Sequence, residues 1–247
     1  MNGKIYLIGL GPGREDCITP QALEALARSQ AVIGHKEAFR LLSGRLEGKE
    51  VIVDAMSPVK RSRLAAGMAG EGRVVAVLSS GHPGIYAIAG TLLSYLKRRR
   101  LKMEVTVIPG MTLADYAAAV LGSPLGADFA VISLADQAGS WSSTRNRMKQ
   151  ALAADFVLVI YNPLGKLGAR RMRAVIKHAF ACRLPSTAVG MVTDAGQAAE
   201  LVSITTLGAL SMDDIKIDSL LIIGSSKTFI YADKMITPRP YREGVGY

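Results

Sequence analysis

The sequence has few cysteines and few aromatic residues, and each shortage excludes a class of protein. Cys17 and Cys182 are the only cysteines among 247 residues, so the chain has no CxxC spacing, no disulfide framework and no zinc site built from thiolates. Aromatic residues make up 6% of the chain, whereas hydrophobic residues make up 49%. This balance is typical of a globular α/β protein and excludes a disordered one.

Long apolar runs are also missing. A segment such as FVLVIY at 156–161 is far too short to cross a bilayer. Met1 leads almost directly into a strand, without the charged and apolar regions of a signal peptide. We therefore expect a soluble protein in a reducing, cytoplasmic setting, with no membrane partner.

Acidic residues are outnumbered, since 30 Lys and Arg face 20 Asp and Glu, for a net charge of +10. A basic surface suits nucleic acid, or a small ligand that carries many carboxylates or phosphates. The basic clusters at 60–63, 97–102 and 169–173 contain no aromatic side chains, which single-stranded nucleic acid needs for stacking. We therefore expect no nucleic-acid partner. Each basic cluster can also be explained as a solvated helix surface that binds no ligand.

Strands and helices alternate along the chain. Continuous β-branched runs such as VVAVLS and SLLIIG indicate strands buried on both faces. Helical stretches fall between the strands, and Thr19-Pro20 is a typical helix start. The predicted helices include 20–29, 85–99 and 112–122, and the predicted strands are 4–9, 31–34, 50–53, 73–79, 104–108, 128–132, 155–161, 187–192, 200–205 and 219–223.

The pattern changes at LGSPLGAD, where Gly and Pro accumulate and strands become more frequent afterwards. We expect two α/β domains, 1–120 and 121–247, the first rich in parallel strands and the second mixed.

The first glycine-rich turn reads Gly9-Leu10-Gly11-Pro12-Gly13-Arg14. A dinucleotide-binding fingerprint needs glycine where Arg14 stands, and Pro12 removes one N–H from a phosphate cradle. The G-K-[ST] of a nucleoside-triphosphate loop is absent as well. The turn therefore permits close approach of the backbone without indicating a phosphate, and a tight turn with no ligand is also consistent.

Three further turns of Gly, Pro and small polar residues follow predicted strands, at 79–86, 109–112 and 161–163. Ligands in α/β sheets collect at the carboxyl ends of strands. Together the four turns predict a ligand that is held largely by main-chain groups.

These segments carry a resemblance to a known family. The stretches YLIGLGPGREDCITPQA, SSGHPGIYAIAG and PGMTLADYAAAVLGSPL resemble, in order and spacing, the motifs of the tetrapyrrole methylases. The resemblance covers nearly the whole chain. It implies the two-domain class III methyltransferase fold, with the active-site cleft between the domains, S-adenosylmethionine as cofactor and a homodimer.

Four other stretches point to one group within the family: FAVISLADQAGSW, VLVIYNPLGKLGARR, VGMVTDAGQAAELV and MITPRPY. They resemble the members that methylate C17 of precorrin-3B or cobalt-precorrin-3 and contract the macrocycle, in cobalamin biosynthesis. The resemblance also implies that the first domain faces the tetrapyrrole and the second completes the cofactor site.

The resemblance implies cofactor contacts at the four turns and in VTDAG. It also implies that the first turn faces the tetrapyrrole and the methyl end of the cofactor. The implied cofactor-binding residues are Pro12, Ser80, Gly81, His82, Ile85, Thr112, Leu113, Tyr161, Asn162, Ala195 and Gly196.

One residue departs from the family pattern. The second turn usually reads Gly-Asp-Pro, and here it reads Gly81-His82-Pro83. An aspartate beside a sulfonium would help by its charge, and a histidine would not. The substitution is tolerated if main-chain groups do most of the holding; otherwise it predicts weakened cofactor binding or activity.

The residues independently fit methyl transfer. The three histidines are scattered, with no Ser-His-Asp set and no HExxH metal motif, and an in-line displacement needs mainly a positioned nucleophile in a dry cleft. Arginine side chains can bind the carboxylates of a precorrin bidentately, so we expect Arg14, Arg61 and Arg145 to bind the substrate. The resemblance, which places the first turn against the tetrapyrrole, adds Gly11 and Gly13. Asp16 and Asp136 are the candidates for proton handling, although each is equally explained as a turn or cap residue.

Two other functions stay open. A methylase of this fold could act on another tetrapyrrole position or on ribosomal RNA. A protein impaired at His82 could bind the ligands without catalysis.

Overall fold

The computed structural model describes residues 3–53, 56–135, 139–164 and 167–239. The chain forms two compact units, Met1–Leu113 and Ala114–Tyr247. The division falls at the start of helix α5 (Leu113–Leu121), earlier than the predicted 120/121, because α5 packs with the second unit.

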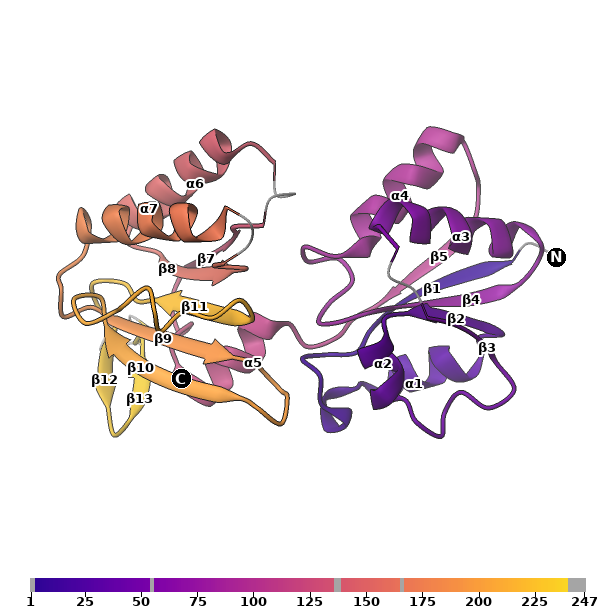
Figure 1. The fold of residues 1–247 in the computed structure, drawn as a ribbon, viewed down its shortest axis with the longest axis horizontal. Helices are drawn as coiled ribbons and strands as arrows, with labels where there is room; N and C mark the ends of the chain where they lie inside the picture. The colour runs from indigo at the N-terminus through magenta and orange to yellow at the C-terminus, as the bar shows by residue number, and fades with distance from the viewer. Residues whose placement is uncertain (1–2, 54–55, 136–138, 165–166, 240–247) are drawn as a thin grey trace, which may run out of the picture. The chain divides into compact units, whose positions relative to one another are not determined.

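The first unit is one parallel sheet with helices on both faces (Figure 1). The strand order is β3-β2-β4-β1-β5, so β4 is the central strand, with β2 and β3 on one side and β1 and β5 on the other. Its elements are β1 (Lys4–Gly9), η1 (Glu15–Cys17), α1 (Pro20–Ala27), β2 (Ala31–Gly34), α2 (Lys36–Leu41), β3 (Glu50–Val53), α3 (Pro58–Gly70), β4 (Val74–Ser79), α4 (Ile88–Arg99) and β5 (Glu104–Ile108).

Alternation along each central strand divides the core of this unit in two. In β1, Ile5 and Leu7 pack with α3 and α4, whereas Tyr6 and Ile8 pack with α1 and α2. Successive side chains of a strand point to opposite faces, so a continuous apolar run is what a doubly covered sheet requires. The apolar segments singled out in the sequence are these strands.

The second unit is built on a mixed sheet with the order β10-β9-β11-β8-β7. Only β7 and β8 pair in parallel, and the remaining neighbours are antiparallel. Its further elements are β6 (Gly122–Ser123), β7 (Phe129–Ser133), α6 (Trp141–Ala153), β8 (Val157–Tyr161), α7 (Gly168–Phe180), β9 (Ala188–Thr193), β10 (Leu201–Thr206), β11 (Ser219–Ile223), β12 (Phe229–Tyr231) and β13 (Lys234–Ile236).

Helices α6 and α7 cover one face of this sheet, with Met148, Leu152, Met172 and Val175 fully buried against it. The other face meets α5 and a small sheet of β12, β13 and β6 (Figure 1). Gly190 in β9 makes this contact possible, because a Cβ there would lie 2.6 Å from a Leu121 methyl group.

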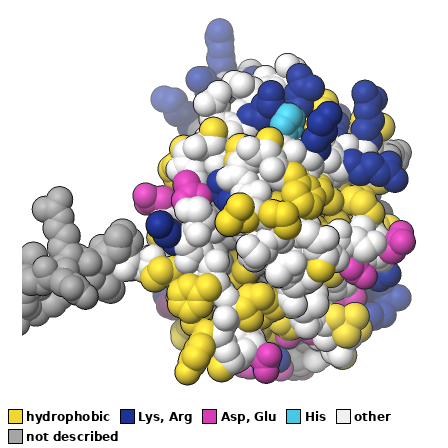
Figure 2. Space-filling model, turned by 90° about the vertical axis from the view of Figure 1, so that its left-hand side faces the viewer, with side chains coloured by type: hydrophobic (Ala, Val, Ile, Leu, Met, Phe, Trp, Pro, Cys, Tyr) yellow, Lys and Arg dark blue, Asp and Glu magenta, His cyan; other side chains and the backbone are white. Residues whose placement is uncertain are grey.

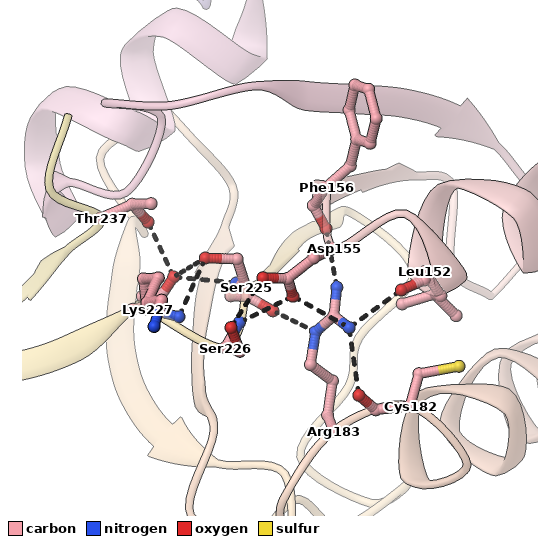
Figure 3. A network of polar contacts seen from close by, with 11 residues as sticks. Leu152, Asp155, Phe156, Cys182, Arg183, Ser225, Ser226, Lys227 and Thr237 are labelled. Carbon is pink, nitrogen blue, oxygen red and sulfur yellow. Dashed lines mark hydrogen bonds and ion pairs between the residues drawn. The ribbon is translucent and has the colours of Figure 1, made fainter. Parts of the chain in front are cut away.

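A buried arginine joins three segments of the second unit (Figure 3). The Arg183 side chain is 2% exposed, and it donates to the carbonyls of Leu152, Phe156 and Gly224 at 2.9, 3.1 and 3.2 Å. Asp155 pairs with it at 3.1 Å, and the Asp155 carboxylate also accepts bonds from Ser226. The charge is thereby paired and hydrogen-bonded, which a buried ion requires.

The fold class predicted from the sequence is confirmed, and every predicted strand is present within a few residues. The helix predicted from residue 85 begins instead at Ile88, because Tyr86 adopts a φ of 51° that no helix allows. Helix α1 begins as predicted, with the Thr19 hydroxyl accepting from the Ala22 N–H at 3.1 Å.

Candidate functional site

Three of the predicted turns lie side by side at one edge of the first sheet. They follow the carboxyl ends of β4, β1 and β5, which are adjacent strands. Parallel strands end at the same edge, so turns separated by many residues in the sequence come together. We call them the first loop (9–14), the second loop (79–86) and the third loop (109–112).

Glycines allow the three backbones to touch. A Cβ on Gly9 would lie 2.6 Å from both the Gly81 oxygen and the Gly110 nitrogen. The Gly81 N–H donates to the Gly11 oxygen at 2.8 Å, and both residues have a positive φ. The glycines therefore serve contact between the loops, which explains why they do not follow a phosphate-binding fingerprint.

The second loop presents its side chains outward. Ile85 is 44% exposed and Tyr86 is 56% exposed, and Ser80 is exposed as well. His82 is half-buried, and its Nδ1 accepts a hydrogen bond from the Gly84 N–H at 2.9 Å. Exposed apolar side chains beside ordered main chain are typical of a ligand site.

The first loop holds an ion pair. Arg14 donates to both carboxylate oxygens of Asp16, at 2.9 and 2.7 Å. The hydrogen bond from Arg14 lowers the pKa of Asp16 below its ordinary value. Both side chains are exposed, so the pair is open to a competing carboxylate. Gly13 lies beside Arg14, and Pro12 is buried.

Arg61 lies at the same edge of the first sheet, beside β2. It is a residue of α3, only 6% exposed, and one guanidinium nitrogen lies 2.7 Å from Nε2 of His35. His35 directly follows β2, the strand next to β4. The other predicted proton-handling residue, Asp136, lies outside the described residues.

The second unit has its own edge of turns, formed where β7, β8 and β9 end. The Tyr161 hydroxyl accepts from the Ala114 N–H at 3.0 Å and so caps the start of α5, just after Thr112 and Leu113. The Asn162 side chain donates to the Ser133 hydroxyl at 3.2 Å and has a φ of 53°. A non-glycine residue in this conformation often marks a functional turn.

The turn after β9 is fixed by a carboxylate. Ala195 and Gly196 are buried, and the Gly196 N–H donates to Glu200 at 2.7 Å. The Thr193 hydroxyl lies 2.7 Å from that of Ser219, which begins β11 between β8 and β9. Sequence reasoning missed both Ser133 and Glu200. The contact of Ser133 with Asn162 joins residues 29 apart, and the bond from Gly196 to Glu200 is local but belongs to no motif that the sequence singled out.

Lys and Arg side chains gather around a histidine on one face of the second unit (Figure 2). Arg145 of α6 lies close enough to His178 of α7 for its charge to act on that ring. Burial lowers the pKa of His178 below its ordinary value, and the charges of Lys149, Arg145 and Lys177 lower it further. Arg171, in contrast, is buried: it donates to the Leu134 carbonyl at 2.8 Å and lies over the Trp141 ring. The sequence motifs FAVISLADQAGSW and VLVIYNPLGKLGARR end in Trp141 and Arg171, so this contact brings the ends of the two motifs together.

Two kinds of feature are not found within the described residues. No cluster of His, Cys, Asp and Glu there could hold a metal ion. No helix there is long and apolar enough to span a membrane.

Comparison with known proteins identifies the family. The model of the Tetrapyrrole (Corrin/Porphyrin) Methylases matches residues 4–211. The chain belongs to this family. The match spans both units and includes every turn described above, so the resemblance seen in the sequence is confirmed.

Within this family, the chain is similar to individual methyltransferases and to a solved structure. The chain is 36% identical over 238 residues to a probable cobalt-factor III C(17)-methyltransferase of Salmonella typhimurium, covering 96% of this chain and 99% of that protein. It is 29% identical to a precorrin-3B C(17)-methyltransferase of Sinorhizobium, covering 98% of each. The crystal structure of the methyltransferase CobJ matches with a TM-score of 0.90 at 29% identity, over 96% of this chain and 100% of that one.

Other relatives are longer. The chain spans 53% of the cobalamin biosynthesis protein CbiHC of Archaeoglobus fulgidus and 46% of a cobalt-factor III methyltransferase of Priestia megaterium. The methylase unit thus occurs both alone and as about half of a larger protein.

Proposed function

We propose that this protein transfers the methyl group of S-adenosylmethionine to C17 of precorrin-3B or of cobalt-precorrin-3, with ring contraction, in cobalamin biosynthesis. The observation that carries the proposal is the 36% identity to a C(17)-methyltransferase over nearly the full length of both chains. The similarity to the structure of the methyltransferase CobJ, at a TM-score of 0.90, supports methyl transfer.

The residues of both edges fit S-adenosylmethionine. In the first unit the second loop offers exposed Ile85 as an apolar surface, beside the main chain of Ser80, Gly81 and His82. In the second unit the turns at Tyr161-Asn162 and Ala195-Gly196 are held in unusual conformations by side-chain bonds. Preorganised main-chain groups bind a ligand without first losing conformational entropy. We assign these residues, with Pro12, Thr112 and Leu113, to the cofactor.

The cofactor supplies an electrophilic methyl group on a sulfonium sulfur. The substrate carbon is the nucleophile, so the protein needs to orient the two reactants and exclude water rather than supply a nucleophile. The absence of a Ser-His-Asp set from the sequence agrees with this division of work.

We assign the carboxylates of the tetrapyrrole to the first loop and to basic side chains. Gly11 and Gly13 would let the macrocycle approach the backbone, and Arg14 would exchange its bond to Asp16 for a substrate carboxylate. Of the two candidates for proton handling, Asp16 is the one that lies within the residues that the structure describes. Arg61, from its position beside His35, and Arg145, from helix α6, would each bind a further carboxylate of the substrate.

We further propose that the protein works in the cytoplasm as a homodimer. The edge strand β10 exposes Leu201 and Val202, which supports contact with a second copy. Cys17 and Cys182 are both free thiols, as a reducing compartment allows. Light scattering of the purified protein gives the oligomeric state.

An anaerobic transfer assay tests the proposed reaction. The protein is incubated with methyl-labelled S-adenosylmethionine and either precorrin-3B or cobalt-precorrin-3. We expect one labelled methyl group in the tetrapyrrole, seen by mass spectrometry, and the accepted substrate identifies the route. Binding of the cofactor without transfer to either tetrapyrrole contradicts the proposal.

A matched pair of variants locates the site. Ser80→Tyr places bulk on the exposed second loop and is expected to lower label transfer by about 100-fold, roughly 2.7 kcal/mol of transition-state stabilisation. Ser43→Tyr makes the same change at an exposed turn elsewhere and should transfer label as the wild type does. Equal activity in both variants contradicts the assignment of the second loop.

The ribosomal RNA alternative is tested in the same assay. An RNA hairpin at moderate salt replaces the tetrapyrrole as acceptor. Because electrostatic RNA binding weakens steeply with salt, label in the RNA under these conditions indicates a specific substrate. We expect none.

A further inference from the structure

The second loop contains a turn that is closed by a histidine side chain. Nδ1 of His82 accepts from the Gly84 N–H at 2.9 Å, and the carbonyl of His82 accepts from the Ile85 N–H at 3.1 Å. An oxygen of Asp or Asn commonly makes the first of these bonds, from a side chain to the N–H two residues on. The imidazole nitrogen makes the same bond here.

The position of this turn gives it influence over the site. At one end Gly81 bonds to Gly11 and contacts Gly9 and Gly110. At the other end the Pro83 carbonyl accepts from Ala89 in α4 at 2.9 Å. The turn therefore sets where exposed Ile85 stands relative to the first and third loops.

We propose that His82 is a positioning residue whose Nδ1 is the acceptor that shapes the second loop. Its bond to Gly84 requires an unprotonated Nδ1, so the neutral ring carries its proton on Nε2. Protonation turns Nδ1 into a donor that faces another donor, and the bond is lost. The shape of the loop is thus coupled to pH, which an amide oxygen at the same position would not allow.

Other titratable groups near the second loop could also make its behaviour depend on pH. Arg14 of the first loop pairs with Asp16 of η1, and His35 lies against Arg61 beside β2. The third loop carries no titratable side chain. His35 is the second group that could produce a pH effect, so it needs its own control.

The first test needs no ligand. In uniformly ¹⁵N-labelled protein, NMR spectra at pH 8 are expected to show His82 as the Nε2–H tautomer, with the Gly84 amide proton bonded to Nδ1. His82→Asn keeps an acceptor and should keep the Gly84 amide protected from hydrogen exchange, whereas His82→Ala should expose it. A His82 ring with its proton on Nδ1 at pH 8 overturns the inference.

The second test reads the loop through the cofactor site and rests on the proposed function. The dissociation constant of S-adenosylhomocysteine is measured by calorimetry from pH 8 to pH 5.5. We expect wild-type affinity to fall about tenfold as the pH drops, and His82→Ala to be about tenfold weaker already at pH 8. His82→Asn should bind more tightly than His82→Ala at pH 8, and its affinity should vary less than twofold with pH.

Controls separate the possible causes. His35→Asn and His178→Asn should keep the wild-type pH dependence, since neither closes the turn. A pH dependence that persists in His82→Asn, or one that is absent from the wild type, overturns the inference. If no form of the protein binds S-adenosylhomocysteine, the proposed function fails, and the NMR experiment still decides the role of His82.

Discussion

At the scale of single residues, this site depends on positions where a side chain has no room. Gly9, Gly81 and Gly110 come from three different loops, and their backbones touch. The requirement is steric at Gly9 and Gly110, whereas Gly81 needs only its positive φ, since the nearest atom to a Cβ there would be the Met111 oxygen at 3.9 Å. The first and third loops therefore need glycine for space, and the second loop needs it for its backbone conformation.

A pair of glycine variants tests this packing. A Cβ at Gly110 would lie 2.7 Å from the carbonyl carbon of Gly9 and still closer to the Gly81 oxygen, so Gly110→Ala should lower the free energy of unfolding by about 1–3 kcal/mol. Gly67→Ala meets nothing within 4 Å inside helix α3 and should raise it by up to about 1 kcal/mol. Denaturant titrations of both variants give the comparison, and similar effects would contradict the steric account.

At the scale of elements, α6 and α7 place cations together on one surface. Arg145 and Lys149 on α6 act on His178 of α7, together with Lys177. Since burial and like charges both disfavour the imidazolium, the folded protein binds a proton at His178 less readily than the unfolded chain does. Stability is therefore lost as the pH falls through and below the ordinary value of 6.5.

Removing one cation should weaken this effect. Lys149→Gln is expected to raise the pKa of His178 and to reduce the loss of stability on acidification. The pKa is followed through the ring proton signals of His178 in an NMR titration. Lys97→Gln, in α4 of the first unit, is the matched control and should leave the His178 titration unchanged. An unchanged pKa in Lys149→Gln contradicts the assignment of the charge.

At the scale of the whole molecule, the net charge of +10 fits the proposed polycarboxylate substrate better than the cofactor. A precorrin carries many negative charges, whereas S-adenosylmethionine has a small net charge. Electrostatic attraction to a basic protein therefore favours the tetrapyrrole selectively.

Salt should separate the two ligands. Raising NaCl from about 50 to about 500 mM shortens the Debye length to a few ångströms, so the KM for the tetrapyrrole is expected to rise several-fold. The dissociation constant of S-adenosylhomocysteine should change less than twofold. Initial rates and calorimetry at both concentrations give the comparison, with sucrose as an uncharged control. A tetrapyrrole KM that does not depend on salt contradicts this role of the charge.

Much of the fold was predictable because its signals are local. The β-branched run of β4 and the cap at Thr19 are consequences of neighbouring residues alone. The small sheet of β6, β12 and β13 was not predicted, since two- and three-residue strands carry no periodic signal. Helix α4 began late for a similar reason: the φ of Tyr86 depends on the loop around it rather than on its residue type.

The sequence by itself determined the order of strands and helices, the turns at the carboxyl ends of the strands and the membership in the methylase family. Each of these follows from residues close together in the chain. Only the tertiary structure decided that Arg61 is buried beside His35 and that Arg171 is buried against the Leu134 carbonyl. A charged or titratable side chain is defined by its partners and its burial, and these come from the packing of segments that are distant in the sequence.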